Sequence, residues 1–332
     1  MYKQIIPDAA KKMNAYGSEG IPYFFMFDFE LEKPLVIPLD RLPDNIIISS
    51  SLFDNTERLP RYAKHEIILS SLPISFIDYK KAFDNVIKNI NHGNSYLVNL
   101  TFPTKIELSE PLDEIFCRSI AKYKLLYRDK FVVFSPETFV RIDEAGRISS
   151  YPMKGTIDAS IPGARQKILE DKKEKAEHNT IVDLIRNDLS IFAENVKVDR
   201  YRYIDTLFTS EGRLLQVSSE ISGCLGVDWK SKTGDIIYSM LPAGSISGAP
   251  KNETLRIIKD SEADKRGYYT GVFGIFNGHK LDSGVMIRFI EQNDTGYVYR
   301  SGGGITSMSD ASKEYDEMKK KIYVPVDRND KS

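Results

Sequence analysis

Cysteine, long apolar runs and net charge are all scarce in this chain of 332 residues. Its two cysteines, Cys117 and Cys224, are too few for a disulfide framework. Its longest apolar run, residues 21–27, ends at Asp28 and is far shorter than the roughly 20 residues of a membrane-spanning helix. The first residues hold no apolar core of signal-peptide length. These absences predict a soluble, cytoplasmic globular protein without a membrane role.

The charge balance excludes further classes. Lys plus Arg number 46 and Asp plus Glu number 47, which gives a net charge of −1. A protein that reads nucleic acid through a broad basic surface would carry an excess of cations, so no nucleic-acid partner is expected. A hydrophobic content of 41% also argues against a disordered chain. An enzyme, a binding module and an inactive scaffold remain possible.

The periodicity of apolar residues favours an α+β fold with antiparallel sheets. Strands are expected at 21–28, 46–50, 96–102, 130–134, 139–142, 148–151, 213–221, 270–277, 283–290 and 296–301. Helices are expected at 76–91, 164–189, 250–260 and 310–322. The strands come in hairpin-like runs separated by single helices, rather than in strict βαβ alternation. The length suggests about two domains, yet no Pro/Gly/Ser-rich linker separates two units.

Two glycine-containing segments are candidate sites. Residues 241–251 (LPAGSISGAPK) lack the Gly-Lys-Ser/Thr of a phosphate loop, but small residues before a helix can leave N–H groups free for an anion. A tight strand-to-helix turn is the alternative. The glycines at 302–304 precede a helix that places Glu314, Glu317 and Lys321 on one face. That face is either a surface ion pair or a pair of carboxylates for a hard divalent cation.

Several other polar residues have a simpler, structural interpretation. Cys224 sits in a Gly-Cys-Leu-Gly turn that lacks the full glutaminase elbow, and no His-x-Glu pair follows, so a buried structural cysteine is expected. The four histidines show no metal-ligand spacing, and His65 and His92 are expected at the surface. The charge run 170–175 is expected to be a solvated helix face. Lys154 follows a strand and is either a solvated loop residue or, if buried, a nucleophile.

Taken in order, several motifs resemble one family. They are GNSYLVNLT (93–101), SPETFVRI (135–142), PMKGT (152–156), KAEHNTIVDLIRNDLS (175–190), LPAGSISGAPK (241–251), GYYTGVFGIF (267–276), DSGVMIRF (282–289), SGGGI (301–305) and KEYDEMKKK (313–321). Together they resemble the chorismate-utilising enzymes, and most closely the component I chains of aminodeoxychorismate synthases.

The resemblance implies an organisation for the whole chain. It implies one large unit with two antiparallel sheets, outer helices and an active site in the cleft between its halves. Residues 1–92 would be a reduced N-terminal part integrated in that fold, 93–325 the chorismate-binding catalytic region, and 326–332 a polar tail.

The resemblance also implies roles for particular residues. Glu177 and Glu317 would bind Mg²⁺ directly and Glu314 mainly through water, with the metal holding the ring carboxylate of chorismate. Glu137 would be the general acid that assists departure of the C4 hydroxyl. The expected substrate-binding residues are Gly155, Thr156, Ser245, Tyr269, Arg288, Gly302, Gly303, Gly304, Lys251 and Lys321.

Lys154 distinguishes between the activities found among the enzymes that the chain resembles. Aminodeoxychorismate synthases have lysine at this position, whereas anthranilate synthases typically have alanine. The implied reaction joins Lys154 covalently to C2 of chorismate, after which ammonia adds at C4 to give 4-amino-4-deoxychorismate on the route to p-aminobenzoate and folate. Leu97 stands where isochorismate and salicylate synthases have a water-activating lysine, so those activities are not expected. Gln216 replaces a histidine and cannot titrate.

The alternatives are a component I of anthranilate synthase and a non-catalytic scaffold of the same fold. Because the chain shows no complete glutaminase motif, its ammonia is expected to come from a separate glutamine amidotransferase subunit.

Overall fold

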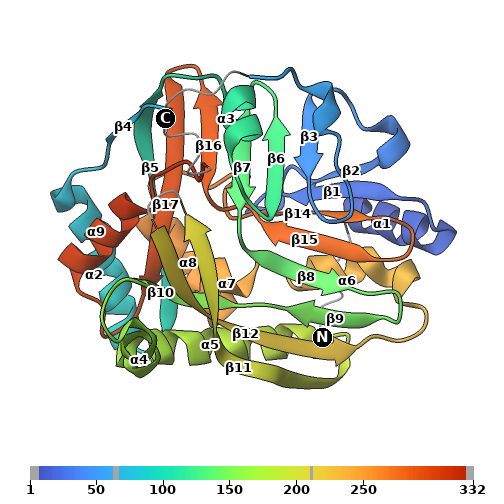
Figure 1. Ribbon diagram of the computed structural model, residues 1–332. Helices are drawn as coiled ribbons and strands as arrows, with labels where there is room; N and C mark the ends of the chain where they lie inside the picture. Colours follow the sequence, from blue (N-terminus) through green and yellow to red (C-terminus); the bar gives the residue numbers. More distant parts are fainter. Residues whose placement is uncertain (1–6, 63–66, 210–211, 327–332) are drawn as a thin grey trace.

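Two antiparallel β-sheets with helices around them make up the computed structural model, which describes residues 7–62, 67–209 and 212–326. In Figure 1 the strands of one sheet run nearly vertically and those of the other cross below them nearly horizontally. The expected α+β class with two antiparallel sheets is therefore confirmed. Among the described residues, no helix is both long and apolar enough to cross a membrane.

The first sheet has nine strands in the order β10-β12-β9-β8-β15-β14-β1-β2, with β11 paired to β12. Its strands are β1 (Tyr23–Phe27), β2 (Leu35–Pro38), β8 (Thr138–Ile142), β9 (Arg147–Ser150), β10 (Met153–Asp158), β11 (Glu194–Thr209), β12 (Gly212–Cys224), β14 (Val272–Phe276) and β15 (Leu281–Val285).

The second sheet has eight strands in the order β13-β5-β17-β16-β7-β6-β3, with β4 paired to β5. Its strands are β3 (Ile46–Ser49), β4 (Leu69–Leu72), β5 (Leu97–Leu108), β6 (Tyr123–Tyr127), β7 (Phe131–Ser135), β13 (Gly248–Ala249), β16 (Phe289–Asn293) and β17 (Gly296–Ile305).

The helices lie around these sheets, with α2, α8 and α9 grouped beside β5 and β17 in Figure 1. The α-helices are α1 (Asp8–Glu19), α2 (Phe76–Asn91), α3 (Leu112–Arg118), α4 (Ala164–Glu170), α5 (Lys172–Leu189), α6 (Thr233–Ser239), α7 (Gly244–Ser247), α8 (Lys251–Ser261) and α9 (Ala311–Lys320). Three short 3-10 turns are η1 (Leu39–Arg41), η2 (Thr56–Arg58) and η3 (Trp229–Lys232).

The segment before residue 93 is woven into both sheets. β1 and β2 close one edge of the first sheet, and β3 forms an edge of the second. Helix α1 packs closely on α6, because a Cβ on Gly234 would lie 2.0 Å from the carbonyl oxygen of Ala10. Of the expected polar tail, residues 327–332 lie outside the described residues, as does His65.

Two elements that the sequence predicts as continuous are each divided into two in the structure. The helix expected over 164–189 is two helices, because Asp171 leaves helical geometry and its side chain accepts a hydrogen bond from the N–H of Glu174, 2.9 Å away, as the N-cap of α5. The strand expected over 283–290 divides into β15 and β16. Arg288 lies at the division with a φ of 53°, which a continuous strand does not allow.

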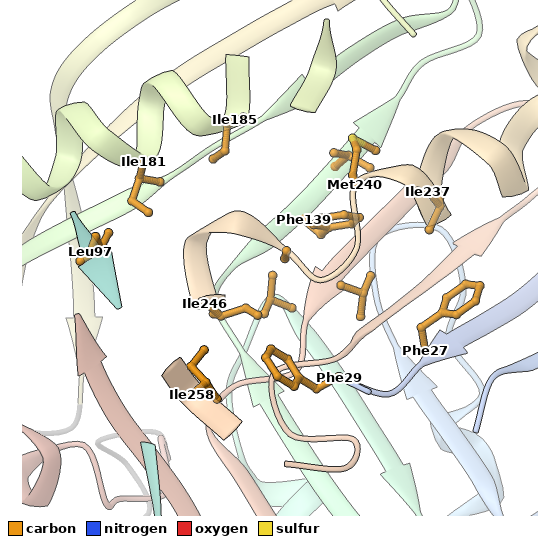
Figure 2. Close-up of a cluster of buried hydrophobic side chains, with 14 of the residues drawn as sticks. Phe27, Phe29, Leu97, Phe139, Ile181, Ile185, Ile237, Met240, Ile246 and Ile258 are labelled. Carbon is orange, nitrogen blue, oxygen red and sulfur yellow. The ribbon is translucent and has the colours of Figure 1, made fainter. Parts of the chain in front are cut away.

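The largest buried cluster of apolar side chains fills the space between the sheets and helices. Figure 2 shows members of this cluster from distant parts of the chain, including Leu97, Phe139, Ile185 and Met240. Burial of such side chains contributes about 1.5–3 kcal/mol each, so this cluster is a main source of stability.

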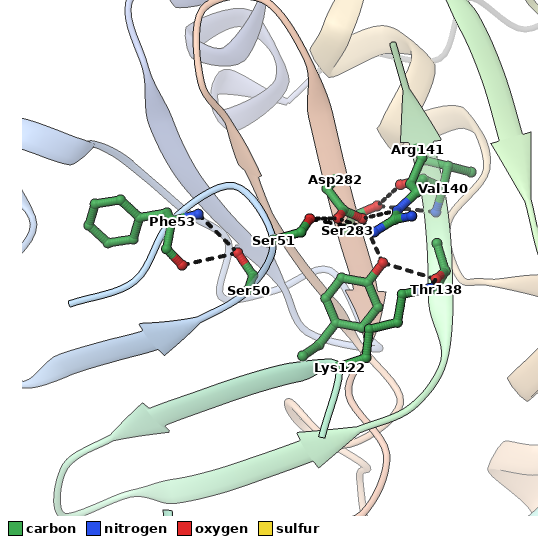
Figure 3. Close-up of polar contacts among 10 residues, drawn as sticks. Ser50, Ser51, Phe53, Lys122, Thr138, Val140, Arg141, Asp282 and Ser283 are labelled. Carbon is green, nitrogen blue, oxygen red and sulfur yellow. Dashed lines mark hydrogen bonds and ion pairs between the residues drawn. The ribbon is translucent and has the colours of Figure 1, made fainter. Parts of the chain in front are cut away.

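A polar network also ties the two sheets together. Asp282 of β15 accepts hydrogen bonds from Tyr123 Oη of β6 (2.6 Å) and from Arg141 Nη2 of β8 (2.9 Å). The Thr138 hydroxyl also contacts Tyr123 Oη, at 2.9 Å (Figure 3). Since buried carboxylates need such partners, the network fixes β8 against β6. Thr138 follows Glu137, so the network also anchors one side of the candidate site.

Candidate active site

Acidic and basic side chains from four separate segments meet near the glycine-rich end of β17. Glu137 lies in the turn between β7 and β8, Lys154 in β10 and Glu177 in α5, while Glu314 and Glu317 lie in α9. The last four lie next to the glycines of β17, and the charges of Lys154 and Lys321 act on Glu137, which places them in one site.

Glu137 is held by its neighbours on both backbone and side chain. Its N–H donates to Ser135 Oγ (3.1 Å), and its carbonyl accepts from the N–H of Val285 (3.1 Å). Its Oε1 accepts a hydrogen bond from Ser245 Oγ. Burial raises the pKa of the Glu137 carboxyl, although the Ser245 bond and the charges of Lys154, Arg288 and Lys321 oppose this. A carboxyl in this state can remain protonated and serve as an acid.

Lys154 lies beside Glu177, with 3.7 Å between Nζ and Oε2. Their side chains are 17% and 4% exposed, so the pair is largely removed from water. Gly304 makes room for both: a Cβ there would lie 3.2 Å from Lys154 Nζ and 3.1 Å from Glu177 Oε2. That Cβ would also lie 3.0 Å from Leu97 Cδ1, so an apolar side chain adjoins this lysine. Lys154 is therefore a half-buried site residue rather than a solvated loop residue.

The carboxylates of α9 lie on the neighbouring part of β17. Lys321 Nζ lies 2.8 Å from Glu317 Oε1 and donates to the carbonyl of Gly302 at 2.8 Å. A Cβ on Gly303 would lie 3.6 Å from Glu314 Oε2 and 4.0 Å from Glu317 Oε1. Burial opposes the ionised form of Glu317, but Lys321, Lys173 and Lys154 together hold its pKa below the ordinary value. The expected face of Glu314, Glu317 and Lys321 thus points into the site.

Two further residues belong here that the sequence analysis assigned to a solvated face. Lys173 Nζ forms ion pairs with Glu314 Oε1 and with Glu177 Oε1, the latter at 3.3 Å. Glu174 lies against β10, where a Cβ on Gly155 would be 3.3 Å from its Oε2. Burial and the charge of Glu177 raise the pKa of Glu174 to about 6. Residues 173 and 174 lie four and three positions before Glu177, so helical spacing places them on the same face as Glu177. This spacing is the feature of the sequence that could have identified them as site residues.

Arg288 lies close enough to Glu137 and to Tyr269 for its charge to act on both. The positive φ of Arg288 turns the chain out of β15, and its Nε donates to Tyr323 Oη at 3.3 Å. Tyr269 is buried, and its burial raises its pKa to about 12, so the phenol remains protonated. A guanidinium and a neutral phenol can both donate to a carboxylate.

Not every expected residue joins this group. Lys251 pairs with Asp188, and Thr156 lies beyond a bulge at Gly155 and is exposed. The expectation of a buried cysteine is also wrong, because Cys224 is exposed at the end of β12. Its strand ends there, so the side chain is not covered by a neighbouring layer.

His178 lies in α5, and Gln216 lies in β12, the strand paired with the β10 strand that holds Lys154. His178 is buried, its Nε2 lies 2.6 Å from Ser219 Oγ, and burial together with Arg202 and Lys154 lowers its pKa to about 4. The imidazole is therefore neutral at pH 7. Gln216 faces Thr156 across β10 and β12, and its Oε1 is buried without a hydrogen-bond partner among the described residues.

The carboxylates suit a hard cation in their chemistry. Glu177 Oε1 is buried and accepts no hydrogen bond among the described residues, although Lys173 Nζ is near. All the candidate donors are carboxylate oxygens, which Mg²⁺ prefers. Within residues 7–62, 67–209 and 212–326, no three His, Cys, Asp or Glu side chains already converge on one point. The ammonium groups of Lys173 and Lys321 lie among these carboxylates. A bound metal cation would therefore replace ion pairs that the carboxylates form with the two lysines.

Comparison with known proteins identifies the family. The model of the chorismate binding enzymes matches residues 39–327, which is most of the chain. The chain belongs to the chorismate binding enzyme family. The match begins well before the first quoted motif at residue 93, so the N-terminal segment takes part in the family fold.

Two relatives of this enzyme match along almost their whole length. A protein of Pasteurella multocida, described as uncharacterized and PabA-like, is 46% identical over 317 residues, covering 95% of this chain and 98% of the relative. One of Haemophilus influenzae with the same description is 47% identical over 326 residues, covering 96% and 97%. Anthranilate synthase component 1 of Aquifex aeolicus is 32% identical over 197 residues, which are 57% of this chain and 38% of that protein.

Solved structures share the fold. Anthranilate synthase component I of Streptococcus pneumoniae superimposes with a TM-score of 0.66 at 24% identity, over 90% of this chain and 70% of that chain. The menaquinone-specific isochorismate synthase of Escherichia coli gives a TM-score of 0.71 at 15% identity, over 94% and 80%. These likenesses support the two-sheet architecture.

Proposed function

We propose that this enzyme converts chorismate and ammonia to 4-amino-4-deoxychorismate. The observation that carries the proposal is Lys154, which lies within the site, 3.7 Å from Glu177 and close enough to Glu137 for its charge to affect that carboxyl. A lysine nucleophile and a carboxyl with a raised pKa are the two groups that the substitution at C4 requires.

In the first step the uncharged amine of Lys154 attacks C2 of chorismate, and the two conjugated double bonds of the ring shift as the C4–O bond breaks. Glu137 gives its proton to the departing hydroxyl, which leaves as water. The lysine nitrogen then carries a positive charge and the Glu137 carboxylate a negative one. The hydrogen bond from Ser245 stabilises that carboxylate.

In the second step ammonia forms a bond to C4, the two ring double bonds shift back, and the C2–N bond to Lys154 breaks. The new ammonium at C4 returns a proton to Glu137, which restores both the acid and the free lysine. Arg288, Tyr269 and the amides at 302–304 are proposed to hold the substrate carboxylates during both steps.

Glu177, Glu314 and Glu317 are proposed to hold Mg²⁺. When bound, the cation would balance the charge of these carboxylates and bind the ring carboxylate of chorismate. It would also weaken the electrostatic stabilisation that Glu177 gives to a charged Lys154. We expect EDTA to abolish turnover and added Mg²⁺ to restore it, because the ring carboxylate would otherwise face three acidic side chains. Product formation before and after chelation is the measurement, and full activity in EDTA would refute the metal site.

The ligand assignment has its own test. Glu177→Gln is expected to weaken Mg²⁺ binding, measured by calorimetry without substrate, at least about 10-fold, which is the size of effect seen when metal-site partners are removed. Asp183→Asn on the exposed side of the same helix is the matched control and should bind Mg²⁺ like the unmodified protein. Equal affinities in the two variants would contradict the assignment.

Ammonia is proposed to come from a separate glutamine amidotransferase subunit. The pure chain is therefore expected to use ammonium salts but not glutamine, since it shows no complete glutaminase motif. Assays with each nitrogen source, with product measured by mass, test this. Glutamine-dependent turnover by the isolated chain would show that the partner is not required.

An anthranilate synthase component I is the second candidate, since such a protein is among the relatives. The same assay separates the candidates, because anthranilate and aminodeoxychorismate differ in mass and in ring aromaticity.

A further inference from the structure

Lys251 has partners other than the carboxylates of the candidate site. Its Nζ lies 2.7 Å from Asp188 Oδ2 and donates to the carbonyl of Met240 at 2.8 Å. The side chains of Lys251 and Asp188 are 18% and 14% exposed, so this ion pair is mostly removed from water. Because two of its three N–H donors are used in these contacts, Lys251 has a structural task that the expected substrate contact does not describe.

Met240 and Lys251 lie at the two ends of one segment. Met240 follows α6 as its C-cap, Lys251 begins α8, and residues 241–250 between them form a loop that contains the short α7 and β13. The Lys251 ammonium group therefore closes this loop at its base and ties it to Asp188 near the end of α5. Figure 2 shows the loop, which carries Ile246, beside Ile181 and Ile185 of α5.

The loop also rests directly on α5. A Cβ on Gly244 would lie 2.6 Å from Leu184 Cδ2 and 3.5 Å from Asp188 Oδ2, so only glycine permits this approach. The next residue, Ser245, donates the hydrogen bond to Glu137. The position of the serine hydroxyl therefore depends on how the loop sits on α5.

Packing on the other side of the loop is interrupted by a small cavity. This cavity of about 20 Å³ adjoins β8, and it is lined by Glu137, Phe139, Ile185, Asp188, Gly244 and Ser245 among others. A cavity leaves atoms on its lining without some of their contacts, so packing restrains this side of the loop less completely. The far part of the loop has ties of its own, because Arg266 Nη1 donates to the Ile246 carbonyl at 2.8 Å and the Tyr96 N–H to the Ala249 carbonyl at 2.9 Å. The contacts of Lys251 restrain the base of the loop, next to Asp188.

We infer that Lys251 is a positioning residue, which acts through Asp188 and the Met240 carbonyl to hold Ser245 against Glu137. The inference rests on the proposed role of Glu137 as an acid. It assigns Lys251 no contact with substrate.

A double-mutant cycle tests the inference. We expect Lys251→Met and Ser245→Ala each to lower kcat about 10-fold or more, at the low end of general acid catalysis, with KM little changed. The double variant should be no slower than Ser245→Ala alone, because both changes remove the same restraint. If the two reductions in kcat multiply in the double variant, or if Lys251→Met raises only KM, the inference is wrong.

A second pair of variants separates positioning from stability. Lys251→Met leaves Asp188 as an unpaired, mostly buried charge, so the melting temperature should fall. Adding Asp188→Asn removes that charge and should recover the melting temperature while kcat stays low, because the tie to Met240 remains broken. Recovery of kcat together with stability would show that Lys251 is merely structural.

Hydrogen exchange gives a readout that does not depend on the reaction. The amides of 241–250 should exchange faster in Lys251→Met than in the unmodified protein, and unchanged exchange would contradict the inference. If the unmodified enzyme converts chorismate to a different product, the proposed function fails, yet the cycle and the exchange still test Lys251 with that product.

Discussion

Replacing Lys154 with alanine is expected to lower the rate of aminodeoxychorismate formation at least about 100-fold, the lower range for a group that takes part directly in the chemistry. The amine lies in the site beside Glu177, and no other lysine is proposed to reach C2 of chorismate. Product formation from chorismate, Mg²⁺ and ammonium, followed by mass, is the measurement. Full activity in this variant would exclude the covalent mechanism.

The covalent step can be observed directly as well. Without ammonia, the unmodified protein incubated with chorismate and Mg²⁺ should gain the mass of chorismate less one water, because the lysine bond forms as the C4 hydroxyl leaves. Lys154→Ala should gain nothing, while Lys259→Ala on the exposed face of α8 should behave like the unmodified protein. An adduct that persists in Lys154→Ala would place the nucleophile elsewhere.

Replacing Glu137 with glutamine is expected to lower kcat about 100-fold to 10,000-fold, the range for a lost general acid. Glutamine keeps the shape and can still accept from Ser245, but it has no proton to give to the C4 hydroxyl. Glu144→Gln in the β8–β9 turn is the exposed control and should retain activity.

The pH dependence of this variant adds a check. Since burial raises the pKa of Glu137, the unmodified enzyme should lose activity as pH rises through that raised value and the acid loses its proton. The residual rate of Glu137→Gln should not show this fall. An identical pH profile in both proteins would assign the acid to another group.

Much of the fold follows from local sequence patterns. The apolar spacing in 76–91 predicts α2 with the bounds that the structure shows, because one face of that helix is buried. The break at Asp171 is harder to predict, since the charged residues on either side favour helix equally well. The break at Arg288 follows from its backbone conformation, which the apolar run through 283–290 does not reveal.

The site itself could not be assembled from spacing. Glu137, Lys154 and Glu177 lie in a turn, a strand and a helix, and only the crossing of two sheets brings them together. The resemblance to a family supplied those residues, whereas it did not supply Lys173, whose ion pairs connect α5 to α9. Lys251 shows a different limit, because its place in a motif suggests a substrate contact but does not reveal its contacts with Asp188 and Met240.

The most direct test of the account is to identify the product that the purified chain forms from chorismate, Mg²⁺ and an ammonium salt. The account predicts 4-amino-4-deoxychorismate, recognised by its mass and by its conversion to p-aminobenzoate with an added lyase. Anthranilate as the product would contradict the assignment to Lys154. Unchanged chorismate would contradict the account as a whole and favour a non-catalytic scaffold.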